Sequence, residues 1–123
     1  MPDEMSADEF NALAAQRKAS KYHNEKTEVD GIMFDSIAEA RHYWDLRHME
    51  RAGEITDLEL QPVFPLIVNG VKVAQYRADF AYVDVATGRR IVQDVKGVRT
   101  PVFALKAKMV KAQYGIDVEE IAA

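Results

Sequence analysis

The segment ADFAYVDVATGRRIVQDVKG, residues 78–97, constrains the fold more than any other part of the chain. Its two halves are typical of β-strands, and the four residues VATG between them predict a tight turn. These predicted strands carry Asp79, Asp94 and Lys96 at positions where apolar residues are expected. A fold that contains this hairpin therefore has to accommodate two carboxylates and one ammonium group.

A four-residue turn at VATG sets the register of the hairpin and places Asp79 directly opposite Asp94, with Cβ atoms roughly 5 Å apart. Two like charges in this arrangement destabilise a sheet unless a positive charge lies between them. A divalent cation such as Mg²⁺ supplies that charge, because it binds carboxylate oxygens and keeps several waters. Lys96 lies on the same face as Asp94 and can hold a water beside the metal. A slip of one residue would pair Asp79 with Val95 instead, so the inference depends on the turn.

A purely structural interpretation of the same residues is open. Asp79 and Asp94 can face solvent, with Arg77 and Lys96 as cross-strand ion-pair partners, and short patterns of this kind often occur by chance. The distribution of charge bears on the choice. The net charge is -4, yet residues 72–111 contain nine basic and three acidic residues, a local charge of +6. A basic region around two carboxylates favours phosphate binding, although a charged face is more usually only solvated.

The N-terminal part of the chain predicts two helices and a hairpin. Ser6 and Glu9 form a capping box that starts a short helix over residues 6–19. Asp30-Gly31 within KTEVDGIMF predicts a two-residue β-turn. A second helix of about sixteen residues starts at Asp35 or Ser36 and stops at Gly53. Its inward face is predicted to carry Ile37, Ala40, Tyr43, Trp44 and Arg47.

The remainder of the chain predicts mainly strands. A strand over residues 55–68 contains Pro62 and Pro65, which favours a sheet edge or a bulge. Asn69-Gly70 is a strong hairpin signal and leads into a strand over residues 71–84. Thr100 and Pro101 predict the start of a third helix, which ends at Gly115 and precedes a short strand, IDVEEI. We expect an acidic N-terminal segment with a short helix over residues 1–20 and one α/β domain over residues 21–123.

Several classes of protein are disfavoured by composition. The longest apolar run, Val63 to Val68, is interrupted by Pro65 and is too short to span a bilayer, so no membrane partner is expected. The N-terminus MPDEMSADEF lacks the apolar region of a secretory signal. The chain has no cysteine, which excludes disulfides and thiolate metal sites. Together these features predict a cytoplasmic protein.

Asp79 followed by Asp94-Val95-Lys96 resembles the signature of the PD-(D/E)XK nuclease superfamily. The element order α-β-β-β-α-β from Ser36 to Ile121 resembles the restriction-endonuclease-like core of that superfamily, which has a mixed sheet. The segments KTEVDGIMFDSIAEA, DLELQP, ADFAY and DVKG are similar to small phage-encoded proteins of the superfamily that were long catalogued as a domain of unknown function. This resemblance covers roughly residues 20–120. Ala78 replaces the proline of the signature, as in many members.

The resemblance implies a DNA endonuclease that depends on Mg²⁺ or Mn²⁺. Asp79 and Asp94 are implied as metal ligands with the Val95 carbonyl as a third, and Lys96 would orient or help deprotonate the attacking water. Glu39, on the second predicted helix, would join the metal site directly or through water. Ser36-x-x-Glu39 is also a capping box, however, and that role accounts for the glutamate without catalysis.

The last predicted helix offers candidate contacts to DNA. Lys106 and Gln113 fall within or beside its predicted core stripe, so Lys106 either snorkels or points toward a phosphate. That stripe is predicted as Val102, Leu105, Met109 and Ala112. The candidate DNA contacts are Lys21, Arg99, Thr100, Lys106, Lys108 and Lys111, and the residues that can border the metal site are Gln61 and Gln113.

We expect the substrate to be branched DNA, such as a Holliday-junction-like intermediate of phage recombination or replication. The domain is nearly all catalytic core, which leaves little room for a sequence-reading module. Resolving a junction requires paired cuts, which predicts a homodimer. Two further classes remain open: a nicking or single-strand-specific nuclease, and a protein without catalytic activity that binds DNA or another partner through the same fold.

Overall fold

The structure, a computed structural model, describes residues 26–96 and 99–123 of the 123-residue chain. The described residues form two compact units, one that ends at His48 and one that starts at Met49. The helix predicted over residues 6–19 and the candidate DNA contact Lys21 lie outside the described residues. Within the described ranges, no helix is long and apolar enough to cross a membrane.

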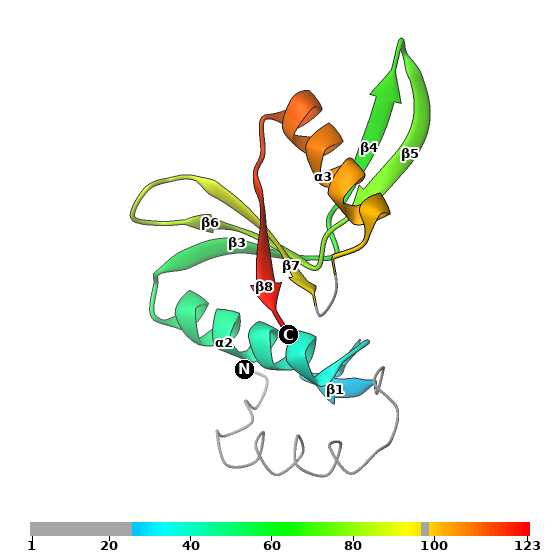
Figure 1. The fold of residues 1–123 in the computed structure, drawn as a ribbon. Coiled ribbons are helices and arrows are strands. Elements are labelled where there is room, and N and C mark those ends of the chain that lie inside the picture. The colour runs from blue at the N-terminus through cyan, green and yellow to red at the C-terminus, as the bar shows by residue number, and fades with distance from the viewer. Residues whose placement is uncertain (1–25, 97–98) are drawn as a thin grey trace. The chain divides into compact units, whose positions relative to one another are not determined.

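The first unit opens with the predicted hairpin. Strands β1 (Thr27–Val29) and β2 (Ile32–Phe34) pair antiparallel (Figure 1). The turn residues Asp30 and Gly31 have φ angles of 54° and 76°, the left-handed conformation that a two-residue hairpin of this kind requires. The turn predicted from the Asp-Gly pair is therefore confirmed.

Helix α2 (Ile37–Arg51) follows this hairpin and begins and ends as predicted. The Ser36 hydroxyl accepts a hydrogen bond from the Glu39 N–H at 3.0 Å, which satisfies one unpaired donor of the first turn. Gly53 ends the helix with a φ of 78°. The buried residues of the helix are Glu39, Ala40, Tyr43 and Leu46. The predicted inward face is thus confirmed for Ala40 and Tyr43, while Ile37, Trp44 and Arg47 are only partly buried.

The second unit contains a mixed sheet. Its four strands have the order β3-β6-β7-β8; β7 and β8 run parallel, and the other neighbours run antiparallel. A separate two-stranded sheet is formed by β4 and β5 (Figure 1). The elements are β3 (Ile55–Leu60), β4 (Val63–Val68), β5 (Val71–Arg77), β6 (Phe80–Asp84), β7 (Arg90–Lys96), α3 (Pro101–Tyr114) and β8 (Val118–Ala122). The predicted α/β class with a mixed sheet is confirmed at this level.

The two long strands predicted over residues 55–68 and 71–84 are each broken into two. The breaks lie opposite one another, because the Gln61 N–H donates to the Asp79 carbonyl at 2.9 Å and the Ala78 N–H donates to the Pro62 carbonyl at 3.1 Å. Gln61 has a left-handed φ of 53°, and Pro62 has no N–H for a ladder. The hairpin therefore changes sheet at this point, and Asp79 lies at the break rather than inside a strand.

Helix α3 packs on the β4–β5 sheet through a face that differs from the predicted stripe. Phe103 and Val110 are buried, whereas Val102 and Leu105 are 62% and 59% exposed. Of the predicted stripe, only Met109 packs against the core, and Ala112 is exposed. Apolar residues lie on more than one face of this helix, so its sequence does not distinguish the buried face. The core of the unit consists of Phe64, Leu66, Tyr76, Ala78, Ala81, Val92, Phe103 and Val110. The predicted Thr100 cap, Pro101 start and Gly115 end of the helix are confirmed.

Candidate active site

The register of the β6–β7 hairpin brings Asp79 and Asp94 together. Phe80 pairs with Gln93 across the VATG turn, as the four-residue turn predicts. Asp79 lies one residue before β6, and its N–H donates to the Gln93 carbonyl at 3.1 Å, which continues the pairing past the end of the strand. The turn length thus sets Asp79 opposite Asp94, the arrangement that the sequence predicts.

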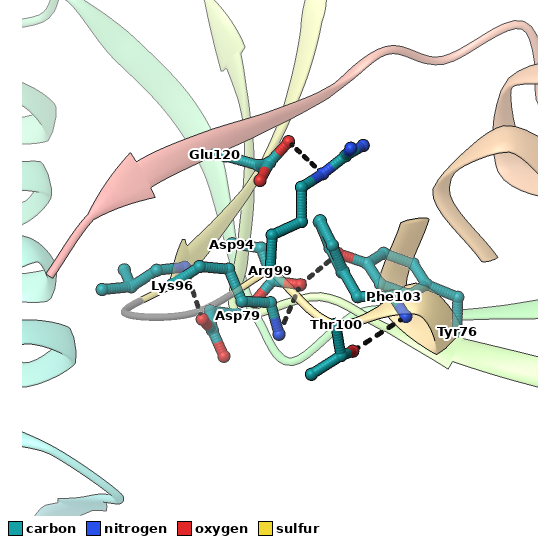
Figure 2. A network of polar contacts seen from close by, with 9 residues as sticks. Tyr76, Asp79, Asp94, Lys96, Arg99, Thr100, Phe103 and Glu120 are labelled. Carbon is teal, nitrogen blue, oxygen red and sulfur yellow. Dashed lines mark hydrogen bonds and ion pairs between the residues drawn. The ribbon is translucent and has the colours of Figure 1, made fainter. Parts of the chain in front are cut away.

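The side chain of Asp79 is fixed onto β7 by a backbone hydrogen bond. Its Oδ2 accepts from the Val95 N–H at 2.8 Å (Figure 2). An N–H donor of this kind favours the ionised carboxylate and limits its rotation. The carboxylate of Asp79 is therefore held next to Asp94 without relying on a flexible loop.

Asp94 is nearly inaccessible to solvent, with 2% of its surface exposed. Burial raises its pKa to about 7, and hydrogen bonding with Asp79 together with the negative charge of that residue acts in the same direction. Two neighbours act in the opposite direction: the Tyr76 hydroxyl donates to Asp94 Oδ2, and Lys96 contributes a positive charge. The effects that raise the pKa of Asp94, burial first among them, outweigh those that lower it.

Lys96 lies beside the pair at the end of β7. Its Nζ is 3.6 Å from Asp94 Oδ2 and 4.6 Å from the centre of the Phe103 ring, so the ammonium contacts both a carboxylate and an aromatic face. The side chain is 31% exposed, which leaves its ammonium accessible to solvent or to a bound molecule. The structure therefore brings Asp79, Asp94 and Lys96 into one site.

A third acid, Glu120, lies on the strand next to Asp94, although it is distant in sequence. It pairs with Asp94 across the parallel strands β7 and β8, so both side chains lie on the same face of the sheet. Its Oε2 is 3.1 Å from Arg99 Nε (Figure 2). The sequence identifies IDVEEI as a strand, but not its parallel register against β7, and the register is what brings Glu120 to Asp94.

The other candidate contacts to DNA have varied surroundings. Arg99 is paired with Glu120, and the Thr100 hydroxyl caps α3 by accepting from the Phe103 N–H at 3.1 Å. Lys108 is exposed, and Lys111 forms an ion pair of 2.9 Å with Asp117. Lys106 is partly buried and lines a cleft near Lys96.

The two glutamines predicted to border the metal site have different positions. Gln61 lies beside Asp79, because its backbone N–H donates a hydrogen bond to the Asp79 carbonyl. The Gln113 side chain contacts β4: its Oε1 accepts from the Ile67 N–H at 2.9 Å, and its Nε2 donates to the Pro65 carbonyl at 3.0 Å. Gln113 therefore satisfies backbone groups of β4 next to the shift of register between Leu66 and Ile67.

Comparison with known proteins identifies one family. The sequence profile of a family described as "Protein of unknown function (DUF1064)" matches residues 19–121. The chain belongs to the DUF1064 family. No curated protein and no solved structure matches the chain. The family description assigns no activity, so the function of this DUF1064 member has to be argued from its residues.

Glu39 lies in the first unit of this DUF1064 member, in the first turn of α2. It is buried, with 7% of its surface exposed, and its Oε2 has no hydrogen-bond partner among the described residues. Ser36 accepts from the Glu39 N–H, but the Glu39 carboxylate does not return a hydrogen bond to Ser36 in the way a full capping box requires. The helix cap therefore uses the backbone N–H of Glu39 and not its carboxylate.

The chemistry of the donor set fits a hard divalent cation. Asp79 and Asp94 adjoin each other on one hairpin, and carboxylate oxygens are the ligands that a hard cation prefers. Mg²⁺ is commonly bound through one or two carboxylates and keeps several waters, so two carboxylates suffice. Within the described ranges, no group of three or more His, Cys, Asp or Glu side chains is arranged to hold a metal. The residues of this DUF1064 member that would hold an ion are therefore Asp79 and Asp94.

Proposed function

We propose that this DUF1064 member is a metal-dependent DNA endonuclease of the PD-(D/E)XK type. The observation that supports this proposal is the contact of Asp79 with Asp94 on one hairpin, with the Lys96 ammonium 3.6 Å from Asp94. The order α2, β3, β6, β7, α3, β8 agrees with the α-β-β-β-α-β order of a restriction-endonuclease-like core, with β4 and β5 inserted between β3 and β6.

Asp79, Asp94 and the Val95 carbonyl would hold Mg²⁺ or Mn²⁺, and Glu39 is a further candidate ligand. Such an ion, when bound, lowers the pKa of a coordinated water and neutralises charge on phosphoryl oxygens. The protein contributes preorganisation. The Val95 N–H fixes Asp79 at 2.8 Å, and the Tyr76 hydroxyl fixes Asp94, so both carboxylates are oriented before substrate binds.

Lys96 has the position and chemistry to act on the reacting groups. Its ammonium is tethered near Asp94 and remains partly exposed, so it can donate hydrogen bonds to a water and to a phosphate oxygen. A cation in this position stabilises the negative charge that develops on the phosphate during hydrolysis. We assign Lys96 the role of orienting the attacking water and stabilising the phosphate.

The proposed substrate is branched DNA, such as a four-way junction. The described strands and helices are all used by the proposed core and its two small hairpins, which leaves little structure for reading base sequence. Recognition of DNA shape is the alternative to recognition of bases. Cutting both strands of a junction requires two active sites, so we propose that the protein acts as a homodimer.

The experiment that tests this function is cleavage of labelled four-way junction, duplex and single-stranded DNA in Mg²⁺ and in Mn²⁺. Asp94→Asn keeps the size of the side chain and should lower the rate by roughly 100-fold or more, because a metal ligand and its charge are lost. The matched control is Asp84→Asn, at the far end of the same hairpin, where Asp84 accepts a hydrogen bond from the Thr87 hydroxyl at 2.7 Å. That variant should cleave like the wild type.

The outcomes distinguish a junction-cleaving enzyme from a nuclease with another substrate and from a DNA-binding protein without activity. Cleavage of the junction that is lost in Asp94→Asn but not in Asp84→Asn supports the full proposal. If only duplex or single-stranded DNA is cleaved or nicked, metal-dependent hydrolysis stands and branched DNA is not the substrate. DNA binding without cleavage in either metal would show a binding protein that shares the fold. An RNA substrate tested in parallel distinguishes a ribonuclease.

A further inference from the structure

A cleft in the second unit lies next to the carboxylate pair. It has a volume of about 530 Å³, which is within the range typical of pockets that bind small ligands. Its walls come from β5, the end of β7 and the first turns of α3, and they include Arg77, Lys96, Thr100 and Lys106. Among the described residues, no aspartate or glutamate lines this cleft.

Two cations of the cleft, Arg77 and Lys106, have no acidic partner at ion-pair distance in the part of the chain that the structure describes. Other cations of this unit do have one, as Arg90 has with Glu59 at 3.3 Å and Lys111 has with Asp117 at 2.9 Å. Positive side chains that gather in a concave surface without acids attract an anion and concentrate it there.

The cleft and the carboxylate pair share two side chains. Tyr76 lines the cleft and donates its hydroxyl hydrogen to Asp94, and Lys96 lines the cleft while its Nζ lies 3.6 Å from Asp94. Figure 2 shows the ends of both side chains meeting at Asp94, with Phe103 and Thr100 from the start of α3 beside them. An anion in the cleft is therefore next to the site at which the proposed reaction takes place.

We propose that this cleft binds a backbone phosphate of the DNA strand that is cut, adjacent to the phosphate that undergoes hydrolysis; this inference rests on the proposed nuclease function. The Arg77 guanidinium matches the geometry of a phosphate through paired N–H groups, and Lys106 adds a point charge from α3. Arg77 precedes Asp79 by two residues, at the end of β5. A phosphate held by Arg77 therefore fixes the strand relative to the carboxylates.

Arg77 and Lys106 are positioning residues in this proposal, because they contact a phosphate that does not react. Backbone contacts of this kind set the register of a nucleic acid without reading its sequence. Their loss should therefore weaken binding of all sequences to a similar degree, reduce the dependence on salt, and raise KM more than it lowers kcat.

The test measures binding and cleavage separately. Binding of a fluorescent four-way junction and of a fluorescent 20-nucleotide single strand is followed by anisotropy between 50 and 300 mM salt, in EDTA, in an Asp94→Asn background that prevents cleavage. Arg77→Gln and Lys106→Gln should each raise Kd about three- to tenfold and reduce the slope of log Kd against log salt by about 1. Arg77→Lys should recover part of the affinity, because it restores the charge without the paired N–H groups.

The matched control is Arg89→Gln, which removes the same charge from an exposed position at the distal turn of the β6–β7 hairpin. In the otherwise wild-type chain with Mg²⁺, the two cleft variants should raise KM and change kcat less than about threefold. If they bind and cleave like Arg89→Gln while the wild type cleaves DNA, the cleft inference is wrong and the nuclease function stands. If the wild type does not cleave but loses affinity on substitution of Arg77 and Lys106, the nuclease function is wrong, and what stands is phosphate binding by the cleft without a neighbouring reaction. Absence of any nucleic-acid binding overturns both.

Discussion

The Tyr76 hydroxyl donates a hydrogen bond to Oδ2 of Asp94, which joins a phenol on β5 to a carboxylate on β7 inside the second unit (Figure 2). Both side chains are buried, with 4% and 2% of their surfaces exposed. Burial and this hydrogen bond raise the pKa of Tyr76, so the phenol keeps its proton and remains a donor. The carboxylate is thus oriented by a group from the neighbouring sheet.

Replacing Tyr76 by Phe should lower the free energy of unfolding by about 2 kcal/mol at pH 8, because a buried carboxylate loses its neutral donor while the ring keeps its packing. Urea unfolding of the metal-free protein measures this. Tyr114→Phe is the control: its hydroxyl donates to the Pro65 carbonyl at 2.7 Å, but the residue is 39% exposed, so water can replace the bond. Equal losses of unfolding free energy in the two variants would show that the Tyr76–Asp94 hydrogen bond stabilises the fold no more than an exposed one does.

The metal-free protein should become less stable as the pH rises from about 4 to about 7. The folded-state pKa of Asp94 is about 7, above the value of about 3.9 for an unperturbed aspartate, so between these values the folded state holds a proton that the unfolded state has released. The stabilisation from this bound proton is complete below the pKa of the unfolded state. It is lost as the pH rises through the pKa of the folded state. The total change is about 4 kcal/mol at most.

Urea unfolding in EDTA across this pH range, in wild type and in Asp94→Asn, isolates the contribution of this carboxylate from that of all others. The difference between the two proteins should follow the titration of Asp94, since asparagine does not ionise. Adding Mg²⁺ at pH 8 should stabilise the wild type and leave Asp94→Asn unaffected. A difference that does not vary with pH would contradict the raised pKa.

Substitutions of Ser36 and Glu39 distinguish the two interpretations of the glutamate, as part of a helix cap or as a metal ligand. Ser36→Ala should cost about 1 kcal/mol of stability, because the Glu39 N–H loses its acceptor, and should leave cleavage unchanged. Glu39→Gln should leave stability unchanged or raise it, because a buried carboxylate oxygen without a hydrogen-bond partner is replaced by a neutral amide. It should also lower cleavage about tenfold or more. Loss of stability without loss of cleavage in Glu39→Gln would assign the residue to the helix cap.

The features that the sequence predicts correctly are those set by a few neighbouring residues. Turn length fixes the pairing of Phe80 with Gln93, and therefore the meeting of Asp79 with Asp94. Thr100 and Gly115 delimit α3, because a hydroxyl can cap the first turn and a glycine can adopt a φ of 73° at the end. Such features need no knowledge of the rest of the fold.

The features that the sequence does not predict depend on tertiary contacts. The break at Asp79 arises because the strand leaves one sheet for another, and the partner at the break, Gln61, is eighteen residues away. Glu120 reaches Asp94 only through the parallel pairing of β7 and β8. The positions of Arg77 and Lys106 around one cleft depend on which face of α3 is buried, and that face cannot be read from a helix with apolar residues on several sides.

Substitution of Gln113 distinguishes a side chain that stabilises the fold from one that orients the metal ligands. Its amide bonds to the Ile67 N–H at 2.9 Å and to the Pro65 carbonyl at 3.0 Å, where the ladder between β4 and β5 shifts register. Gln113→Ala should therefore lower the free energy of unfolding by about 1 kcal/mol and speed hydrogen exchange at the Ile67 amide. Cleavage should remain at the wild-type rate. A variant that is as stable as the wild type but cleaves slowly would instead place Gln113 in support of the metal ligands, as one interpretation of the sequence suggests.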